Sequence, residues 1–171
     1  MNLSLEPFFN NSLHLLCIAG FDGYFKKVNP ALVSLLEYTE EELFSKKISE
    51  FIFEEDRNLT NGFRESLIRG TPLLNFENRY KSKSGKIIWI NWTSIPLIHE
   101  QLIYALAKDV TYKKQLELER SSEFLKLDKK NQNLKTLNYK TSHDLRSPIN
   151  NILALTNLLN LDTVVDDDNL Q

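Results

Sequence analysis

The chain has few of the residues that build disulfide frameworks, membrane spans and secretion signals. Its single cysteine, Cys17, excludes an internal disulfide and a metal site made of several cysteines. Cys17 lies in an apolar run, so we expect it to be a small core residue and expect no metal centre. No apolar run approaches the roughly 20 residues of a membrane span, and no basic segment precedes an apolar one at the N-terminus. We therefore expect a cytoplasmic chain without a membrane span.

The chain also lacks a strong net charge, and its second half lacks glycine. The net charge of −2, with lysines dispersed among acids, provides no patch for nucleic acid. All five glycines precede residue 86, so no glycine-rich loop for nucleotide phosphates lies beyond it. An apolar content of 42% over 171 residues is sufficient for one domain of ordinary size with an extension.

The amino-acid composition of the chain changes near residue 111. Residues 12–111 contain most of the aromatic residues and the turn signals, whereas residues 112–160 contain no glycine and one proline. In the first part, Asp22-Gly23 and Ser84-Gly85 are hairpin signals that separate apolar runs of strand length. We expect strands at Leu13–Ala19, Gly23–Val28, Leu73–Lys83, Lys86–Ile98 and Gln101–Val110.

Short helices are predicted between the second and third of these strands. Asn29-Pro30 fits an N-cap followed by proline at the first helical position. Thr39–Glu42 fits a capping box, and Asp56 is a candidate cap for a helix that Gly70 ends. We therefore expect an α+β fold, an antiparallel five-stranded sheet with helices on one face.

The second part predicts a long helix with a heptad seam. Counted from Phe124, apolar residues recur at steps of three and four, with Asn131 and Asn138 at a positions, where a buried Asn fixes partner number and register. Leucines beside the seam widen it, which favours a dimeric helical bundle over a simple coiled coil. We expect a homodimer through residues 112–160; the alternative is a single helix that folds back on the first domain.

His143 falls at f in this register, the position farthest from the seam, so it is predicted to be exposed. Ser147 lies one turn further on the same face, and Asp144 is adjacent in sequence. Pro148 lacks an N–H and crowds the carbonyl of Asp144, so we expect a local distortion. A neutral imidazole oriented by a carboxylate is a nucleophile, and an exposed one suits a γ-phosphoryl group brought by another domain. The alternatives are a helix that restarts at Ser147 and an inert surface histidine.

Several segments of the first part, by their order and spacing, resemble the PAS domain family. The resemblance covers roughly residues 10–111 and rests on Ile18–Pro30, Leu36–Leu43, Phe53–Arg57, Arg79–Lys86 and Asp109–Thr111. Phe53-Glu54 departs from the pattern, because many relatives have His-Pro there. The ligand is not indicated: the cysteine motif of flavin photosensors is absent, and the helix expected after Asp56 lacks the histidine of haem-binding relatives.

Ser142–Ile149 closely matches the phosphoacceptor motif, or H-box, of sensor histidine kinases. The resemblance implies that His143 is autophosphorylated, that Asp144 is its acid/base helper, and that Ser147 occupies the position where phosphatase-active relatives often have Thr or Asn. It implies a PAS sensor domain at 1–111, a coiled-coil signalling linker at 112–140, and the start of a dimerisation and phosphoacceptor domain at 141–171.

The same resemblance implies a two-component system. ATP would serve the parent kinase, bound by a catalytic domain that this sequence does not contain, so the chain alone is expected to be inactive. The expected partners are that catalytic domain and a response regulator whose aspartate receives the phosphoryl group. The alternative is a non-enzymatic PAS module for dimerisation or ligand binding.

Overall fold

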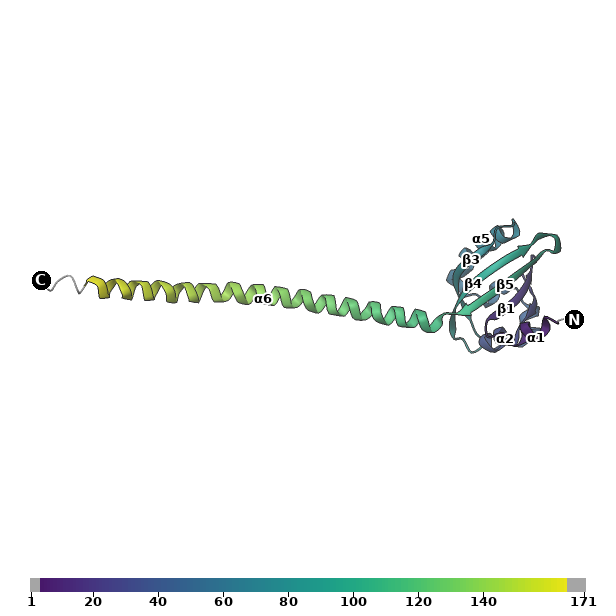
Figure 1. Ribbon diagram of the computed structural model, residues 1–171, viewed down its shortest axis with the longest axis horizontal. Coiled ribbons are helices and arrows are strands. Elements are labelled where there is room, and N and C mark those ends of the chain that lie inside the picture. The colour runs from purple at the N-terminus through teal and green to yellow at the C-terminus, as the bar shows by residue number, and fades with distance from the viewer. Residues whose placement is uncertain (1–3, 166–171) are drawn as a thin grey trace. The chain divides into compact units, whose positions relative to one another are not determined.

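The computed structural model describes residues 4–165, with side chains up to Thr156. The chain divides into two compact units between Glu117 and Leu118. The first unit contains a sheet with its helices, and the second consists of the greater part of the long helix α6 (Thr111–Val165) (Figure 1). The last six residues of the predicted segment 141–171 lie outside the described residues.

The predicted antiparallel five-stranded sheet is confirmed. Its strands follow the order β2-β1-β5-β4-β3, so the first and last strands of the domain are neighbours in the middle of the sheet (Figure 1). Each strand lies within a residue or two of its predicted range. The bounds are β1 (Leu15–Gly20), β2 (Phe25–Val28), β3 (Leu73–Lys81), β4 (Ile87–Leu97) and β5 (Leu102–Asp109).

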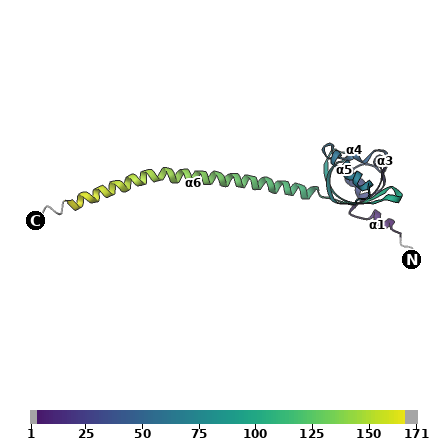
Figure 2. The same ribbon diagram turned by 90° about the horizontal axis from the view of Figure 1, so that it is seen from above.

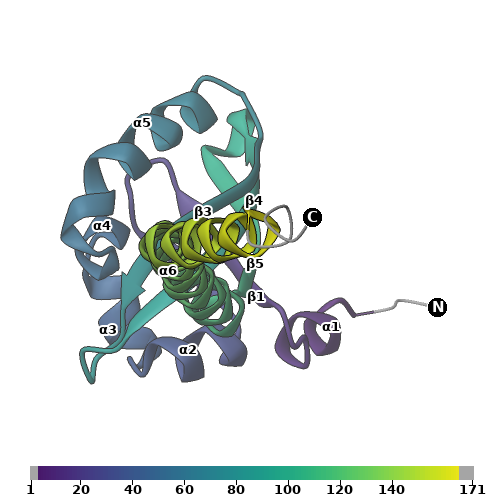
Figure 3. The same cartoon turned by 90° about the vertical axis from the view of Figure 1, so that its left-hand side faces the viewer.

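Helices cover one face of this sheet, as the sequence predicts (Figures 2 and 3). A further short helix near the N-terminus was not anticipated from the sequence. The bounds are α1 (Glu6–Asn10), α2 (Pro30–Leu36), α3 (Glu40–Ser45), α4 (Ile48–Phe51) and α5 (Arg57–Ile68), with single 3-10 turns at η1 (Glu54–Asp56) and η2 (Ile98–Glu100).

The helix ends follow local side-chain chemistry. The Asn29 side chain accepts a hydrogen bond from the Leu32 N–H, and it also accepts one from Leu16 N–H in β1, so it ties α2 to the sheet. Thr39 and Glu42 form the predicted capping box of α3. Gly70 takes a positive φ of 95° just after α5, a conformation that glycine adopts without steric strain.

The core lies between the helices and one face of the sheet. Along β4, Ile88, Ile90 and Trp92 are buried, whereas Trp89 and Asn91 on the opposite face are only half-buried. This is the alternation that the sequence predicts for the strand. Leu32, Leu36, Leu43 and Phe51 pack against the buried residues of the sheet from the helical side.

Helix α6 continues through Pro148 without a break. The helix therefore does not stop and restart at Ser147. Every described side chain from Leu118 to Thr156 is exposed. In the described part of the chain, no helix combines the length and the apolar character that crossing a membrane requires.

Candidate functional site

The predicted phosphoacceptor residues lie together on α6. The side chains of His143 and Asp144 are 72% and 75% exposed, and His143 Nδ1 is 3.6 Å from Asp144 Oδ1. This distance is slightly too long for a hydrogen bond, and a small rotamer change would close it. Ser147, one turn further along, is also exposed. The structure thus places all three predicted residues at one stretch of helix surface.

A hydrogen bond between His143 and Asp144 would determine which ring nitrogen is free to react. When Nδ1 carries the proton and faces the carboxylate, Nε2 keeps its lone pair and becomes the nucleophilic atom. Exposure alone does not distinguish His143, since it shares exposure with its neighbours along the second unit. Its distinguishing feature is the register, which sets it opposite the apolar seam. Its role as phosphoacceptor stays a prediction.

The seam residues of α6 are large, apolar and exposed. Phe124 is 71% exposed and Leu127 61%, and the same holds for Leu134, Leu145 and Ile152. Monomeric soluble proteins rarely present a continuous apolar stripe of this kind to water. The stripe is typical of a helix that packs against partner helices.

The start of α6 is attached to the sheet of the first unit. Asp109 Oδ1 accepts a 2.8 Å hydrogen bond from the Thr111 N–H, and Thr111 Oγ1 accepts one of 2.9 Å from the Trp89 N–H. Lys114 Nζ forms a 2.6 Å ion pair with Glu77 and lies 5.4 Å from the centre of the Trp89 ring. Glu77 raises the pKa of Lys114 by accepting its hydrogen bond. The first turn of α6 is therefore bound to β3 and β4.

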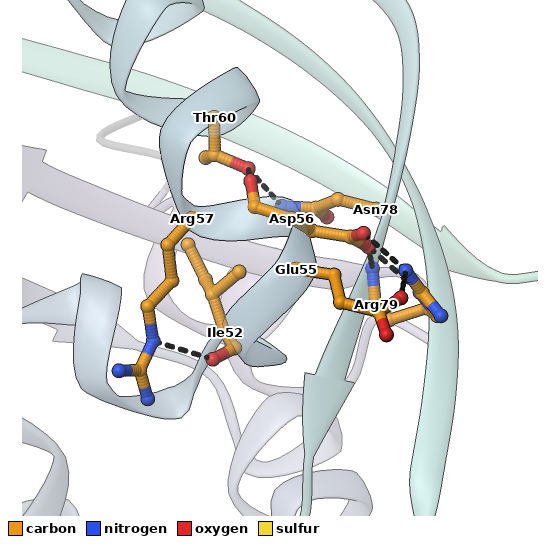
Figure 4. A network of polar contacts seen from close by, with 7 residues as sticks. All are labelled: Ile52, Glu55, Asp56, Arg57, Thr60, Asn78 and Arg79. Atoms are coloured by element: carbon orange, nitrogen blue, oxygen red, sulfur yellow. Dashed lines mark hydrogen bonds and ion pairs between the residues drawn. The ribbon is translucent and has the colours of Figure 1, made fainter.

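A second polar network connects α5 to β3 (Figure 4). Asp56 Oδ2 accepts hydrogen bonds from the backbone N and from Nε of Arg79, at 2.7 and 3.0 Å, and these lower the pKa of Asp56. Arg79 also pairs with Glu55 and lies over the Phe53 ring, 4.5 Å from its centre. Asp56 is therefore not the side-chain cap that the sequence suggested, because Arg79 occupies its carboxylate.

The first unit contains a partly open cavity of about 320 Å³ between α5 and the sheet. Cys17 lines it from β1 and is buried as predicted; burial raises the pKa of its thiol to about 12. Arg64 of α5 also lines the cavity, and sequence reasoning did not identify it. The sequence spacing could have indicated Arg64 as a lining residue, because Thr60, Arg64 and Leu67 recur at steps of four and three and so share one helix face.

Comparison with known proteins identifies the fold of the first unit. Residues 25–102 match the family model described as PAS fold. Among solved structures, a domain of a sensory box sensor histidine kinase/response regulator from Geobacter sulfurreducens is 20% identical, with a TM-score of 0.55 over 61% of this chain and 90% of that one. No curated protein matches the chain.

Two further solved structures support this assignment. A PAS domain from Colwellia psychrerythraea is 17% identical, with a TM-score of 0.55 over 63% of this chain and 94% of that one. A PAS domain from Desulfitobacterium hafniense is 21% identical, with a TM-score of 0.53 over 60% of this chain and 98% of that one. The first unit therefore has the PAS fold, as the sequence resemblance implied.

Proposed function

We propose that this chain is the sensory and phosphoacceptor portion of a two-component histidine kinase. The PAS domain receives a signal, and α6 carries it to His143. His143 accepts a phosphoryl group and passes it to an aspartate of a response regulator. The observation that carries the proposal is the match of Ser142–Ile149 to the H-box, on an unbroken helix that follows a PAS domain.

The proposed chemistry assigns a role to each residue of the site. Nε2 of His143 attacks the γ-phosphorus of ATP held by a kinase catalytic domain. The bond from that phosphorus to the β,γ-bridging oxygen breaks, and ADP leaves. Asp144 accepts the proton from Nδ1, which would otherwise leave a positively charged ring. Ser147 lies one turn away, where its hydroxyl can orient a water molecule toward the phosphohistidine.

The proposed dimer leaves the site accessible. Pairing of two α6 helices through residues 112–160 would bury the apolar seam, including Phe124 and Leu127. His143, at the f position, would then remain on the outer surface, where a catalytic domain and a response regulator can each approach it.

Phosphorylation in trans tests this proposal. The full chain is mixed with the purified ATP-binding domain of a sensor kinase that has the same H-box, and with ATP labelled at the γ-phosphate. We expect label on the wild-type chain that is stable to alkali and lost in acid, as phosphohistidine requires. His143→Ala should abolish it, whereas the matched change His99→Ala should leave it unchanged.

Three further outcomes bear on the proposal. Asp144→Asn keeps the shape of the side chain but removes the proton acceptor, so we expect labelling to slow by about 10²–10⁴-fold. Label that persists in His143→Ala would refute the assignment of the phosphoacceptor. The exposed seam of α6 also fits the alternative of a dimerisation module, and a stable dimer that never accepts label would favour that alternative.

A further inference from the structure

The cavity of the PAS domain combines an apolar interior with a cationic side chain. At about 320 Å³ it lies at the lower end of the range of about 300–1,000 Å³ typical of ligand sites, so its occupant must be small. Ile52, Leu67, Phe76 and Ile103 contribute apolar walls from the helices and the sheet. An occupant therefore needs an apolar body.

Arg64 provides hydrogen-bond donors that no residue described by the structure accepts. Its Nη2 donates to the backbone carbonyls of Gly20 and Phe21, at 2.8 and 3.0 Å. A guanidinium has five N–H donors, so those on Nη1 and Nε remain available for another acceptor. Among the residues whose side chains the structure describes, no carboxylate forms an ion pair with Arg64. Burial lowers the pKa of Arg64, and Asp22 only partly offsets that effect.

The acid nearest to this site is already paired. Asp22 lines the cavity, but its Oδ2 is 2.6 Å from Lys26 Nζ, and its Oδ1 accepts a hydrogen bond from the Tyr24 N–H. Lys47 adds a second positive charge to the lining. The charged side chains around the cavity therefore leave an excess of positive charge beside an apolar interior, which favours an anion.

We propose that the PAS cavity binds a small organic carboxylate with an apolar body, and that Arg64 holds the carboxylate. This inference rests on the proposed sensing function, because it names the chemical class of the signal. Binding itself needs neither His143 nor a kinase domain. A carboxylate would accept a charge-assisted hydrogen bond from Nη1 of Arg64, and its alkyl or aryl portion would lie against Leu67 and Phe76.

Calorimetric titration of the full chain with octanoate and with 1-octanol tests the inference. The two probes share the alkyl chain and differ in the charged group, so their comparison isolates the contribution of the carboxylate. We expect octanoate to bind at least tenfold more tightly than 1-octanol. Arg64→Gln should reduce this preference to less than twofold, whereas Arg64→Lys, which keeps the charge, should retain part of it.

Arg69→Gln is the matched control. Arg69 follows α5, is two-thirds exposed, pairs with Glu65 and does not line the cavity, so its loss should leave the preference for octanoate unchanged. Circular dichroism establishes that each variant is folded. If Arg64→Gln does not fold, the wild-type comparison and Arg64→Lys still decide the question.

Three results would overturn the inference: equal or tighter binding of 1-octanol, no binding of octanoate, or an unchanged preference in folded Arg64→Gln. Repeating the titration with His143→Ala separates this inference from the phosphoacceptor proposal. That variant should bind octanoate as the wild type does, although it accepts no label. Labelling of wild-type His143 without octanoate binding would refute the ligand class alone.

Discussion

At the scale of single residues, the pair formed by Asp56 and Arg79 holds the start of α5 against β3. The side chains are only 15% and 24% exposed, and Asp56 bonds both the guanidinium and the backbone of Arg79. Such charge-assisted bonds are stronger than neutral ones, and removal of Asp56 leaves the partly buried Arg79 with only the exposed Glu55 as an acidic partner. The pair therefore contributes more than an exposed ion pair of similar length.

We predict that Asp56→Asn lowers the free energy of unfolding at pH 7 by about 1–3 kcal/mol. The pKa of Asp56 is lowered in the folded state, so its stabilising contribution is complete above the unfolded pKa of about 3.9 and is lost as the pH falls through the folded pKa. The difference between wild type and Asp56→Asn should therefore shrink below about pH 4. Urea unfolding followed by tryptophan fluorescence measures it.

Glu55→Gln is the control for Asp56→Asn. Glu55 pairs with the same Arg79, but its side chain is 72% exposed, so we expect a loss below about 1 kcal/mol. An equal loss in both variants, or a loss in Asp56→Asn that does not change with pH, would contradict the special role of Asp56.

At the scale of elements, the junction of β5 and α6 depends on Thr111. This residue is 8% exposed, and its hydroxyl accepts the Trp89 N–H of β4. We predict that Thr111→Val, which keeps the shape, lowers the free energy of unfolding of the first unit by about 1–3 kcal/mol, because it leaves a backbone donor unsatisfied. Urea unfolding followed by tryptophan fluorescence measures the loss.

Thr141→Val is the matched control for Thr111→Val. Thr141 is exposed on α6, and its hydroxyl donates only to the Leu137 carbonyl one turn earlier in the same helix. The change should therefore alter stability by less than about 0.5 kcal/mol. A Thr111→Val variant as stable as this control would show that the junction does not depend on the hydroxyl.

The elements were predictable to the extent that their signals are local. The caps at Asn29 and Thr39 and the turn at Gly23 depend on residues adjacent in sequence, so they were predicted correctly. Asp56 and Arg64 were misjudged or missed, because their partners, Arg79 and the carbonyls at Gly20 and Phe21, are distant in the sequence. The resemblance to the H-box rests on the sequence alone, and the structure adds the exposure of this segment and the proximity of His143 to Asp144.

At the scale of the whole molecule, the two units have different sources of stability. The first has its own core of buried residues between helices and sheet. The second consists of one helix whose described side chains are all exposed. Most helical stability in proteins comes from packing of an apolar face rather than from intrinsic propensity. The second unit should therefore depend on partner helices, whereas the first should not.

This difference predicts two thermal transitions with different dependence on protein concentration. Both tryptophans lie in the first unit, so their fluorescence reports its unfolding, which should not change between about 1 and 100 µM chain. Circular dichroism at 222 nm also reports α6. Its helical transition should move to higher temperature over the same range, since association stabilises by mass action.

The asparagines at the seam provide the decisive variant. Replacing Asn131 and Asn138 by Leu removes two polar groups from a positions, so the transition of α6 should move to higher temperature, while the fluorescence transition of the first unit stays fixed. The same change should make the oligomeric state of α6 less strictly defined. Sedimentation equilibrium would detect this as species larger than the dimer. A transition of α6 that is independent of concentration and unaffected by the double change, in a chain that sediments as a monomer, would show that the seam pairs no helices.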